Sequence, residues 1–325
     1  MASPTSPAAT RPHDSKASPR PLKRWLSPAI AVVATGVAAF LLYRALKDYS
    51  AEELIAAVTG FPVERLLFAA LFAALSYLCL TGFDMLALRY VQKPLPYPKV
   101  ALTSFTALSI GHTIGLAALS SGAVRYRFYS RWGLSLAEIA QVIVFCGLTV
   151  GVGLVTLGGI ALLARPDLAA EVTGVSRALV IGIGISCVIA IAAYLAAAAF
   201  YRRKITIRGE EIALPPFRLA IGQIIIGATN FAAVAACLHQ VLMAVSEVSY
   251  LQTAAVYVIA NTLALVSHVP GGLGVIESVV MYLVQGKTLI GALLVFRFTY
   301  FLAPFVLGLL LFGASELFYR RRARA

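Results

Sequence analysis

The chain has 325 residues, of which 60% are hydrophobic and 13% are charged. Because soluble domains have about 25% charged residues, this composition excludes a soluble enzyme, a disordered protein and a disulfide-stapled secreted domain. The net charge of +13 comes mostly from basic residues at the termini and between apolar runs, which is typical of cytoplasmic membrane loops rather than of nucleic-acid binding. The four cysteines lie in separate apolar runs, so they indicate neither a zinc site nor disulfides. The sequence therefore predicts an all-α polytopic membrane protein without a metal or cofactor.

The N-terminal part of the chain predicts a tail followed by a first membrane helix. Residues 1–24 are rich in Pro, Ser, Ala and basic side chains, so we expect a disordered basic tail. The apolar run at residues 29–42 has the length of a signal-peptide core, but no small-residue cleavage site follows it. We therefore predict an uncleaved transmembrane helix there, at the start of a membrane domain over residues 25–320.

Longer apolar runs predict further spans, because about 20 apolar residues cross a bilayer and must be helical within it. With the first helix they make about eight transmembrane segments, near residues 63–88, 100–119, 137–163, 177–200, 217–241, 250–267 and 288–318. Small residues inside these runs predict close helix–helix contacts, as at Gly151, Gly153, Gly158 and Gly159.

Two short segments are predicted at the membrane surface. Polar and apolar residues alternate at positions 204–208, and Gly209 follows. This pattern predicts a short cytoplasmic hairpin or loop within residues 201–216. Residues 321–325 form a basic C-terminal tail.

The positions of Lys and Arg predict how the chain crosses the membrane. Basic loops should be cytoplasmic, but simple alternation of the spans places residues 125–131 and 202–208 outside. The conflict disappears if two segments enter the membrane, turn inside it and leave on the side from which they entered. The first is residues 100–131, with a turn at Ser-Ser-Gly (120–122). The second is residues 250–287, with a turn at His-Val-Pro-Gly-Gly (268–272). Two such breaks from opposite faces predict two re-entrant hairpins and an inverted repeat. A short internal match that superimposes Gly122 on Gly272 supports this prediction, and two ordinary kinks in full spans are the alternative.

Charged residues inside membrane helices are costly and mark functional sites by default. Asp84 is predicted to be the counter-charge of a cationic headgroup or of an internal arginine, with a local pair to Arg89 as the alternative. Arg125 and Arg127 follow the Ser-Ser-Gly break. Free backbone N–H groups and two guanidinium groups there predict a phosphate site, to which Ser121 and Gly122 belong. A plain basic loop is the alternative reading.

Further polar residues are grouped around the second break. Glu277 is predicted to hold an amine, to pair with an arginine, or to compensate the positive end of a helix. Arg297 must face the protein interior, and we favour a structural pair with Asp84 or Glu277. The remaining candidates are expected to line a cavity or to form a break, namely His112, Asn230, Asn261, His268, Pro270, Gly271 and Gly272. No catalytic motif occurs in a suitable context, so we do not expect an enzyme.

Three stretches carry a resemblance to a known family, namely FDMLALRY (83–90), SGAVRYRFYS (121–130) and PGGLGVIE (270–277). They resemble the N-terminal membrane domain of the multiple peptide resistance factor (MprF) family, which defines the wider lysylphosphatidylglycerol synthase transmembrane family. That family makes aminoacyl-phosphatidylglycerol and moves it between leaflets. The resemblance covers roughly residues 25–320. It implies that Asp84 and Arg125 belong to the flippase charges, and that Glu277 matches the acidic residue after PGGLG.

The resemblance implies a phospholipid flippase for (aminoacyl-)phosphatidylglycerol, such as lysyl-phosphatidylglycerol, linked to resistance against cationic antimicrobial peptides. Because bifunctional members continue into a synthase domain and this chain stops at Ala325, we expect no synthase activity. The expected location is a bacterial inner membrane, with both termini cytoplasmic. The alternatives are a transporter of a small anionic solute, and a membrane partner of a separate phosphatidylglycerol lysyltransferase. Small-residue helix faces permit a homodimer without requiring one.

Overall fold

The structure is a computed structural model that describes residues 59–114, 117–201, 205–207, 210–212, 214–267, 269–284 and 289–322. The predicted tail at residues 1–24, the first helix at residues 29–42, the break residue His268 and residues 323–325 lie outside the described residues. All secondary-structure elements in the described part are helices except for one short two-stranded hairpin, as expected for an all-α membrane protein.

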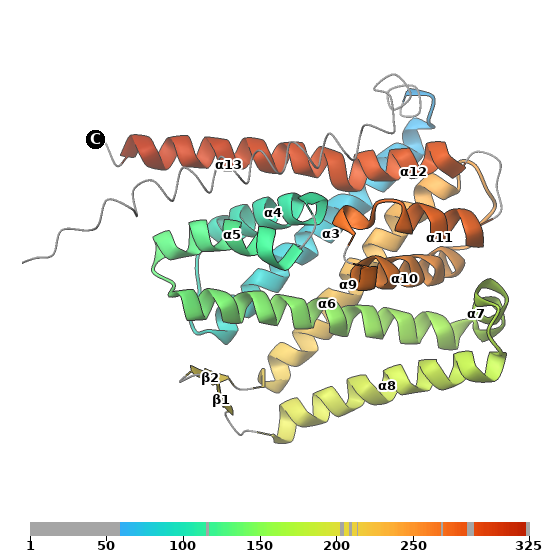
Figure 1. Ribbon diagram of the computed structural model, residues 1–325, viewed down its shortest axis with the longest axis horizontal. Helices are drawn as coiled ribbons and strands as arrows, with labels where there is room; N and C mark the ends of the chain where they lie inside the picture. Colours follow the sequence, from blue (N-terminus) through green and yellow to red (C-terminus); the bar gives the residue numbers. More distant parts are fainter. Residues whose placement is uncertain are drawn as a thin grey trace, which may run out of the picture.

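Long apolar helices form the frame of the molecule (Figure 1). They are α3 (Val63–Tyr90), α6 (Leu136–Ala164), α8 (Arg177–Phe200), α9 (Phe217–Leu242) and the continuous run of α12 (Leu289–Arg297), the π-helical turn η3 (Phe298–Leu302) and α13 (Ala303–Arg322). Together with α10 (Tyr250–Ser267), these make six helices in the described residues that are long and apolar enough to cross a membrane. The predicted number was about eight. The difference arises because the first helix lies outside the described residues and the predicted span at residues 100–119 is divided between α4, which ends at Ile114, and α5, which begins at Ala117.

Short elements connect the frame. The 3-10 turn η1 (Ser130–Trp132) precedes α6, and α7 (Pro166–Thr173) links α6 to α8. The surface strands β1 (Ile205–Ile207) and β2 (Glu210–Ile212) pair antiparallel, with Ile205 opposite Ile212. The alternating pattern around Gly209 therefore corresponds to a hairpin in the structure.

Two helical hairpins enter the frame from opposite ends (Figure 1). The first consists of α4 (Tyr97–Ile114) and α5 (Ala117–Tyr129). The second consists of α10, the turn η2 (Pro270–Gly272) and α11 (Val275–Leu283). Their tips meet, since a Cβ atom placed on Gly271 would lie 3.3 Å from the carbonyl oxygen of His112. The prediction of two re-entrant hairpins is therefore confirmed.

The first break lies earlier in the chain than predicted. Residues 120–122 are inside α5, whereas α4 ends at Ile114 and α5 begins at Ala117. The Ser-Ser-Gly sequence is compatible with the helix because Ser121 faces Arg125 one turn later and accepts a hydrogen bond from it. The predicted superposition of Gly122 on Gly272 is therefore wrong.

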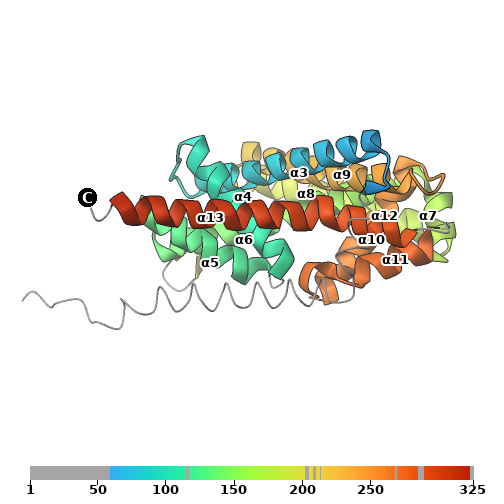
Figure 2. The same ribbon diagram turned by 90° about the horizontal axis from the view of Figure 1, so that it is seen from above.

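The correct repeat is visible in where the elements begin. The first unit is α3, the α4–α5 hairpin and α6, and the second is α9, the α10–α11 hairpin and the α12–α13 run. The starts of α3 and α9, Val63 and Phe217, are 154 residues apart, while α10 and α12 begin 153 residues after α4 and α6. The two units run in opposite directions (Figure 1), and α3 and α9 pack side by side along one face (Figure 2). The fold is therefore an inverted repeat.

The hairpins also place the basic segments together. The C-terminal ends of α3, α5, α8 and α13 lie at the same end of the molecule (Figure 1). We call this the basic end, because these helix ends and the adjoining loops carry Arg89, Lys93, Lys99, Arg127, Arg131 and Arg321. This arrangement removes the conflict that simple alternation of spans creates.

Candidate functional site

A cavity of about 500 Å³ lies where the two hairpin tips meet. Both repeats contribute walls to it, from α3, α4, α5, α6, α9, α10 and α11 and from the turns η2 and η3. Most lining side chains are apolar, and the polar ones are His112, Ser121, Arg125, Asn230, Tyr257, Asn261 and Tyr300. A largely apolar pocket with a few convergent polar groups is the usual form of a small-molecule site.

The charged group in the cavity wall is Arg125, which is paired with Asp84. Its Nε donates to Asp84 Oδ1 at 2.8 Å, its Nη2 donates to Oδ2 at 2.7 Å, and its Nη1 donates to Ser121 Oγ at 3.0 Å. The hydroxyl of Tyr129 donates to Asp84 Oδ1 at 2.8 Å. Ser121, Arg125 and Tyr129 are four residues apart along α5, so one face of this helix surrounds the carboxylate of α3.

Asp84 and Arg125 form an ion pair that is buried away from solvent. Asp84 is completely buried and Arg125 is only 2% exposed. An isolated charge at such a position is very costly, so each group depends on the other for its ionised form. A guanidinium has five N–H donors, and the three bonds above hold it in one orientation in the cavity wall. The local pair of Asp84 with Arg89 that the sequence suggested is replaced by this pair across helices.

The second ion pair stabilises the break of the second hairpin. Arg297 donates to both carboxylate oxygens of Glu277 and to the backbone carbonyls of Gly271 and Gly272. Glu277 also accepts a hydrogen bond of 2.9 Å from the N–H of Gly274. Non-helical backbone at membrane depth requires such partners within the protein. Arg297 therefore forms the structural pair that the sequence favoured, and Glu277 is its carboxylate partner.

The backbone of this break depends on glycine. Gly271, Gly272 and Gly274 have φ angles of 58°, 59° and 76°, a region that residues with a Cβ atom rarely adopt. Gly271 and Gly272 line the cavity directly, so the PGGLG sequence forms part of its wall.

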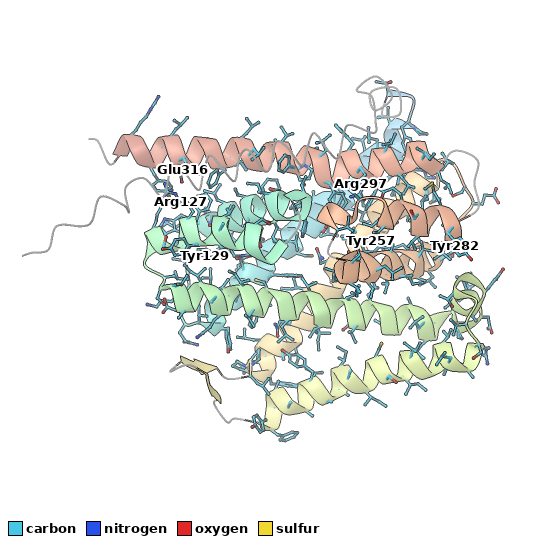
Figure 3. All side chains as sticks on the ribbon, in the orientation of Figure 1. Arg127, Tyr129, Tyr257, Tyr282, Arg297 and Glu316 are labelled. Atoms are coloured by element: carbon cyan, nitrogen blue, oxygen red, sulfur yellow. The ribbon has the colours of Figure 1, made fainter. Side chains whose placement is uncertain are left out.

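Arg127 lies in a different place from Arg125. It reaches Glu316 of α13, with Nη2 and Oε2 2.9 Å apart, and Arg131 binds the same carboxylate. Figure 3 shows Arg127 and Glu316 side by side at the basic end, away from Arg297 and Tyr257 near the hairpin tips. Among the described residues, neither Arg127 nor Gly122 lines the cavity. The predicted phosphate set is therefore divided, and only Arg125 and Ser121 share one site.

Three groups in or beside the cavity wall were not among the residues predicted from the sequence, namely Ser76, Tyr129 and Tyr300. The hydroxyl of Ser76 donates to Asn230 at 2.7 Å and lies 2.9 Å from the hydroxyl of Tyr300. Tyr129 could have been found from its four-residue spacing to Arg125, but nothing in the sequence indicates that α3, α9 and η3 share a polar contact. The predicted cavity residues His112, Asn230 and Asn261 do line the cavity, whereas the three residues predicted as its charged groups, Asp84, Glu277 and Arg297, are not among its lining residues. The side chain of Pro270 is outside the described set.

The fold and the site define a class: a polytopic membrane protein built as an inverted repeat, with an ion-paired cavity between two opposed hairpins. Within this class, the chain belongs to the family described as the lysylphosphatidylglycerol synthase TM region, which matches residues 29–308. This match confirms the family resemblance that the three sequence stretches indicated.

Two relatives cover most of the chain. An uncharacterized protein of Synechocystis sp., slr0712, is 32% identical over 283 residues, which cover 86% of this chain and 88% of the relative. The inner membrane protein YbhN of Escherichia coli is 29% identical over 281 residues, which cover 85% of this chain and 84% of the relative. The chain is thus similar along most of its length to proteins of comparable size.

Proposed function

We propose that the protein is a phospholipid flippase that binds an anionic headgroup in the cavity between its hairpin tips. The observation that carries this proposal is the buried guanidinium of Arg125 in the wall of a largely apolar cavity. Arginine suits phosphate because its planar fork donates two parallel hydrogen bonds. An arginine that is already oriented by Asp84 and Ser121 needs little rearrangement when the phosphate arrives.

The arrangement of the two repeats supports translocation rather than static binding. Opposed repeats around a site near the membrane midplane allow one repeat to rock against the other, which opens the site to each side in turn. The hairpin tips meet at this cavity and come from opposite ends of the molecule. A headgroup held there is therefore accessible to either leaflet after a movement of one hairpin.

The family suggests the identity of the lipid. We propose phosphatidylglycerol or its lysyl derivative as the substrate, since the matching family is described by lysylphosphatidylglycerol synthase. We place the protein in a bacterial inner membrane, as in the relative whose name states this location. The basic end then faces the cytoplasm.

The test is a leaflet-exchange assay in liposomes that contain fluorescent phosphatidylglycerol or lysyl-phosphatidylglycerol, with a membrane-impermeant quencher outside. We expect the protein to accelerate exchange of at least one of them. The critical variant is the double substitution Asp84→Asn with Arg125→Gln, which removes the guanidinium without leaving a buried charge unpaired. It should remain folded and lose exchange. The matched control is Arg127→Gln, because Arg127 is on the same helix but contacts Glu316 instead of lining the cavity.

Two outcomes would overturn the proposal. One is a folded double variant that exchanges lipid as fast as the wild type. The other is a wild-type protein that gives no exchange above protein-free liposomes but accumulates soluble glycerol phosphate inside them, which would assign a transporter of small anions.

A further inference from the structure

The cavity wall has a gap on α6. Gly147 and Gly151 line the cavity, both are exposed, and among the described residues a Cβ atom on either would meet nothing within 4 Å. Other glycines of the same helix pack tightly, as at Gly153, where a Cβ atom would lie 2.5 Å from the carbonyl carbon of Gly227. The predicted close contact is therefore present at Gly153 and wrong for Gly151. Since glycine disfavours a helix, two helical glycines that the described residues leave uncovered need another explanation.

Neighbouring helices define the limits of this gap. On one side, α5 covers α6 at Ile143, whose Cδ1 lies 3.0 Å from a Cβ atom placed on Gly122. On the other side, α10 covers α6 at Gly158, where a Cβ atom would lie 3.3 Å from Val258. Gly147 and Gly151 fall between these two contacts. Within the described residues, the cavity thus opens sideways between α5 and α10 across the two glycines, which we call the glycine portal.

The portal lies at the depth of the hydrocarbon core. Gly147 and Gly151 are about 17 and 23 Å along α6 from Leu136, at 1.5 Å per residue, in a helix of 29 residues. They are therefore near the middle of a helix about 44 Å long, where acyl chains surround a membrane protein. The adjacent side chains Val144 and Leu148 are apolar and 68% and 39% exposed, as expected for a surface in contact with lipid.

Comparison of the two repeats shows that the first repeat has this opening and that the second repeat has a side chain at the equivalent position. With the offset of 153 residues between α6 and α12, the position equivalent to Gly147 is Tyr300. This tyrosine lines the cavity, is only 4% exposed and lies within hydrogen-bonding distance of Ser76. One repeat therefore fills this position with an aromatic ring, while the other leaves it without a side chain.

We propose that the glycine portal is the lateral passage for a membrane lipid, whose phosphate lies at Arg125 while its acyl chains extend across Gly147 and Gly151 into the bilayer. This inference rests on the proposed function and specifies its substrate class. The ligand is an anionic lipid that stays partly embedded in the membrane, and not a soluble phosphate ester. The charge of Arg125 inside the cavity matches the anionic headgroup of such a lipid, and the apolar residues around the portal match its acyl chains.

The first test closes the portal with the side chain that the other repeat uses. In the liposome assay, Gly147→Tyr should reduce the exchange of fluorescent phosphatidylglycerol at least tenfold, and Gly147→Ala should reduce it less, because a Cβ atom alone meets no described neighbour there. The matched control is Gly182→Tyr on α8, another exposed helical glycine at which a Cβ atom would meet no described residue within 4 Å. Size-exclusion profiles and far-UV circular dichroism establish that each variant is folded.

The second test does not require transport. Phosphatidylglycerol with a photoreactive diazirine in one acyl chain is added to the reconstituted wild type, and labelled peptides are mapped. We expect labelling of the segment 144–151 of α6 and of the half-exposed Leu265 on α10, and a loss of both in Gly147→Tyr. The portal would be refuted if these segments stayed unlabelled. It would also be refuted if a cysteine at position 147 formed a disulfide with one in residues 29–42, because the chain itself would then cover the opening.

The results separate the two proposals. If Gly147→Tyr exchanges lipid like the wild type while the Asp84→Asn, Arg125→Gln double variant is inactive, the portal is wrong and the flippase proposal stands. If the wild type neither exchanges nor photolabels, the flippase proposal fails and the portal fails with it.

Discussion

Replacing Asp84 with Asn removes the carboxylate that pairs with Arg125 through two hydrogen bonds, of 2.8 and 2.7 Å, at a site where the arginine is 2% exposed. Removing one partner of a buried ion pair costs about 3–5 kcal/mol, because the other charge stays buried without compensation. Removing both charges is much less costly, since no charge then remains to be desolvated. We therefore expect Asp84→Asn and Arg125→Gln each to lower the free energy of unfolding by about 3–5 kcal/mol, and the double variant to lower it by about 1 kcal/mol or less.

The assay is a double-substitution cycle measured by SDS-induced unfolding in mixed micelles, followed by far-UV circular dichroism. The control is Asp167→Asn, which breaks the exposed pair between Asp167 and Arg177 and should cost about 1 kcal/mol or less. Additive effects, in which the double variant loses the sum of the two single losses within about 0.5 kcal/mol, would refute the reasoning that the pair is one energetic unit.

Three further substitutions test the hairpins and the helix packing by the same unfolding assay. Arg297→Met should cost about 3–5 kcal/mol, because it leaves the buried Glu277 carboxylate without its counter-charge and two glycine carbonyls without this donor. A loss below about 1 kcal/mol would contradict the structural role. Gly272→Ala should cost at least about 1–2 kcal/mol, since its φ is 59° and the new methyl group would lie 2.9 Å from Ala264. Gly153→Ala should cost about 1–3 kcal/mol by pushing α6 from α9. Gly182→Ala, whose methyl group meets none of the described residues, should be neutral or slightly stabilising.

The long helices could be predicted closely from the sequence, because the length of an apolar run in a membrane sets the length of a helix. The predicted span at residues 177–200 coincides with α8 (Arg177–Phe200), and the one at residues 217–241 ends one residue before α9 does. The distribution of basic residues also predicted the two hairpins, since simple alternation of the spans places two of the basic segments on the outer side. These properties depend on composition along the chain and not on which helices touch.

The first break and the ion pairs depend on contacts across helices, so the sequence pattern could not decide them. Ser-Ser-Gly looks like a break because it is polar, but Ser121 is used inside α5 as an acceptor for Arg125. Asp84 and Arg125 are 41 residues apart and meet only because α5 returns beside α3. The sequence named two partners for Arg297, and the fold selects Glu277 because α11 packs against α12.

The two buried ion pairs have a consequence for how the protein responds to voltage. The hairpin α4–α5 carries a cation into the membrane and the hairpin α10–α11 carries an anion, and each has its counter-ion on a neighbouring helix. Moving one elementary charge through a membrane potential involves about 2.3 kcal/mol per 100 mV. A rearrangement that keeps both pairs intact moves no net charge through this field. The two ion pairs therefore contribute no net charge to such a movement, and in the proposed function the membrane potential would act on it through other charges, such as that of the bound lipid.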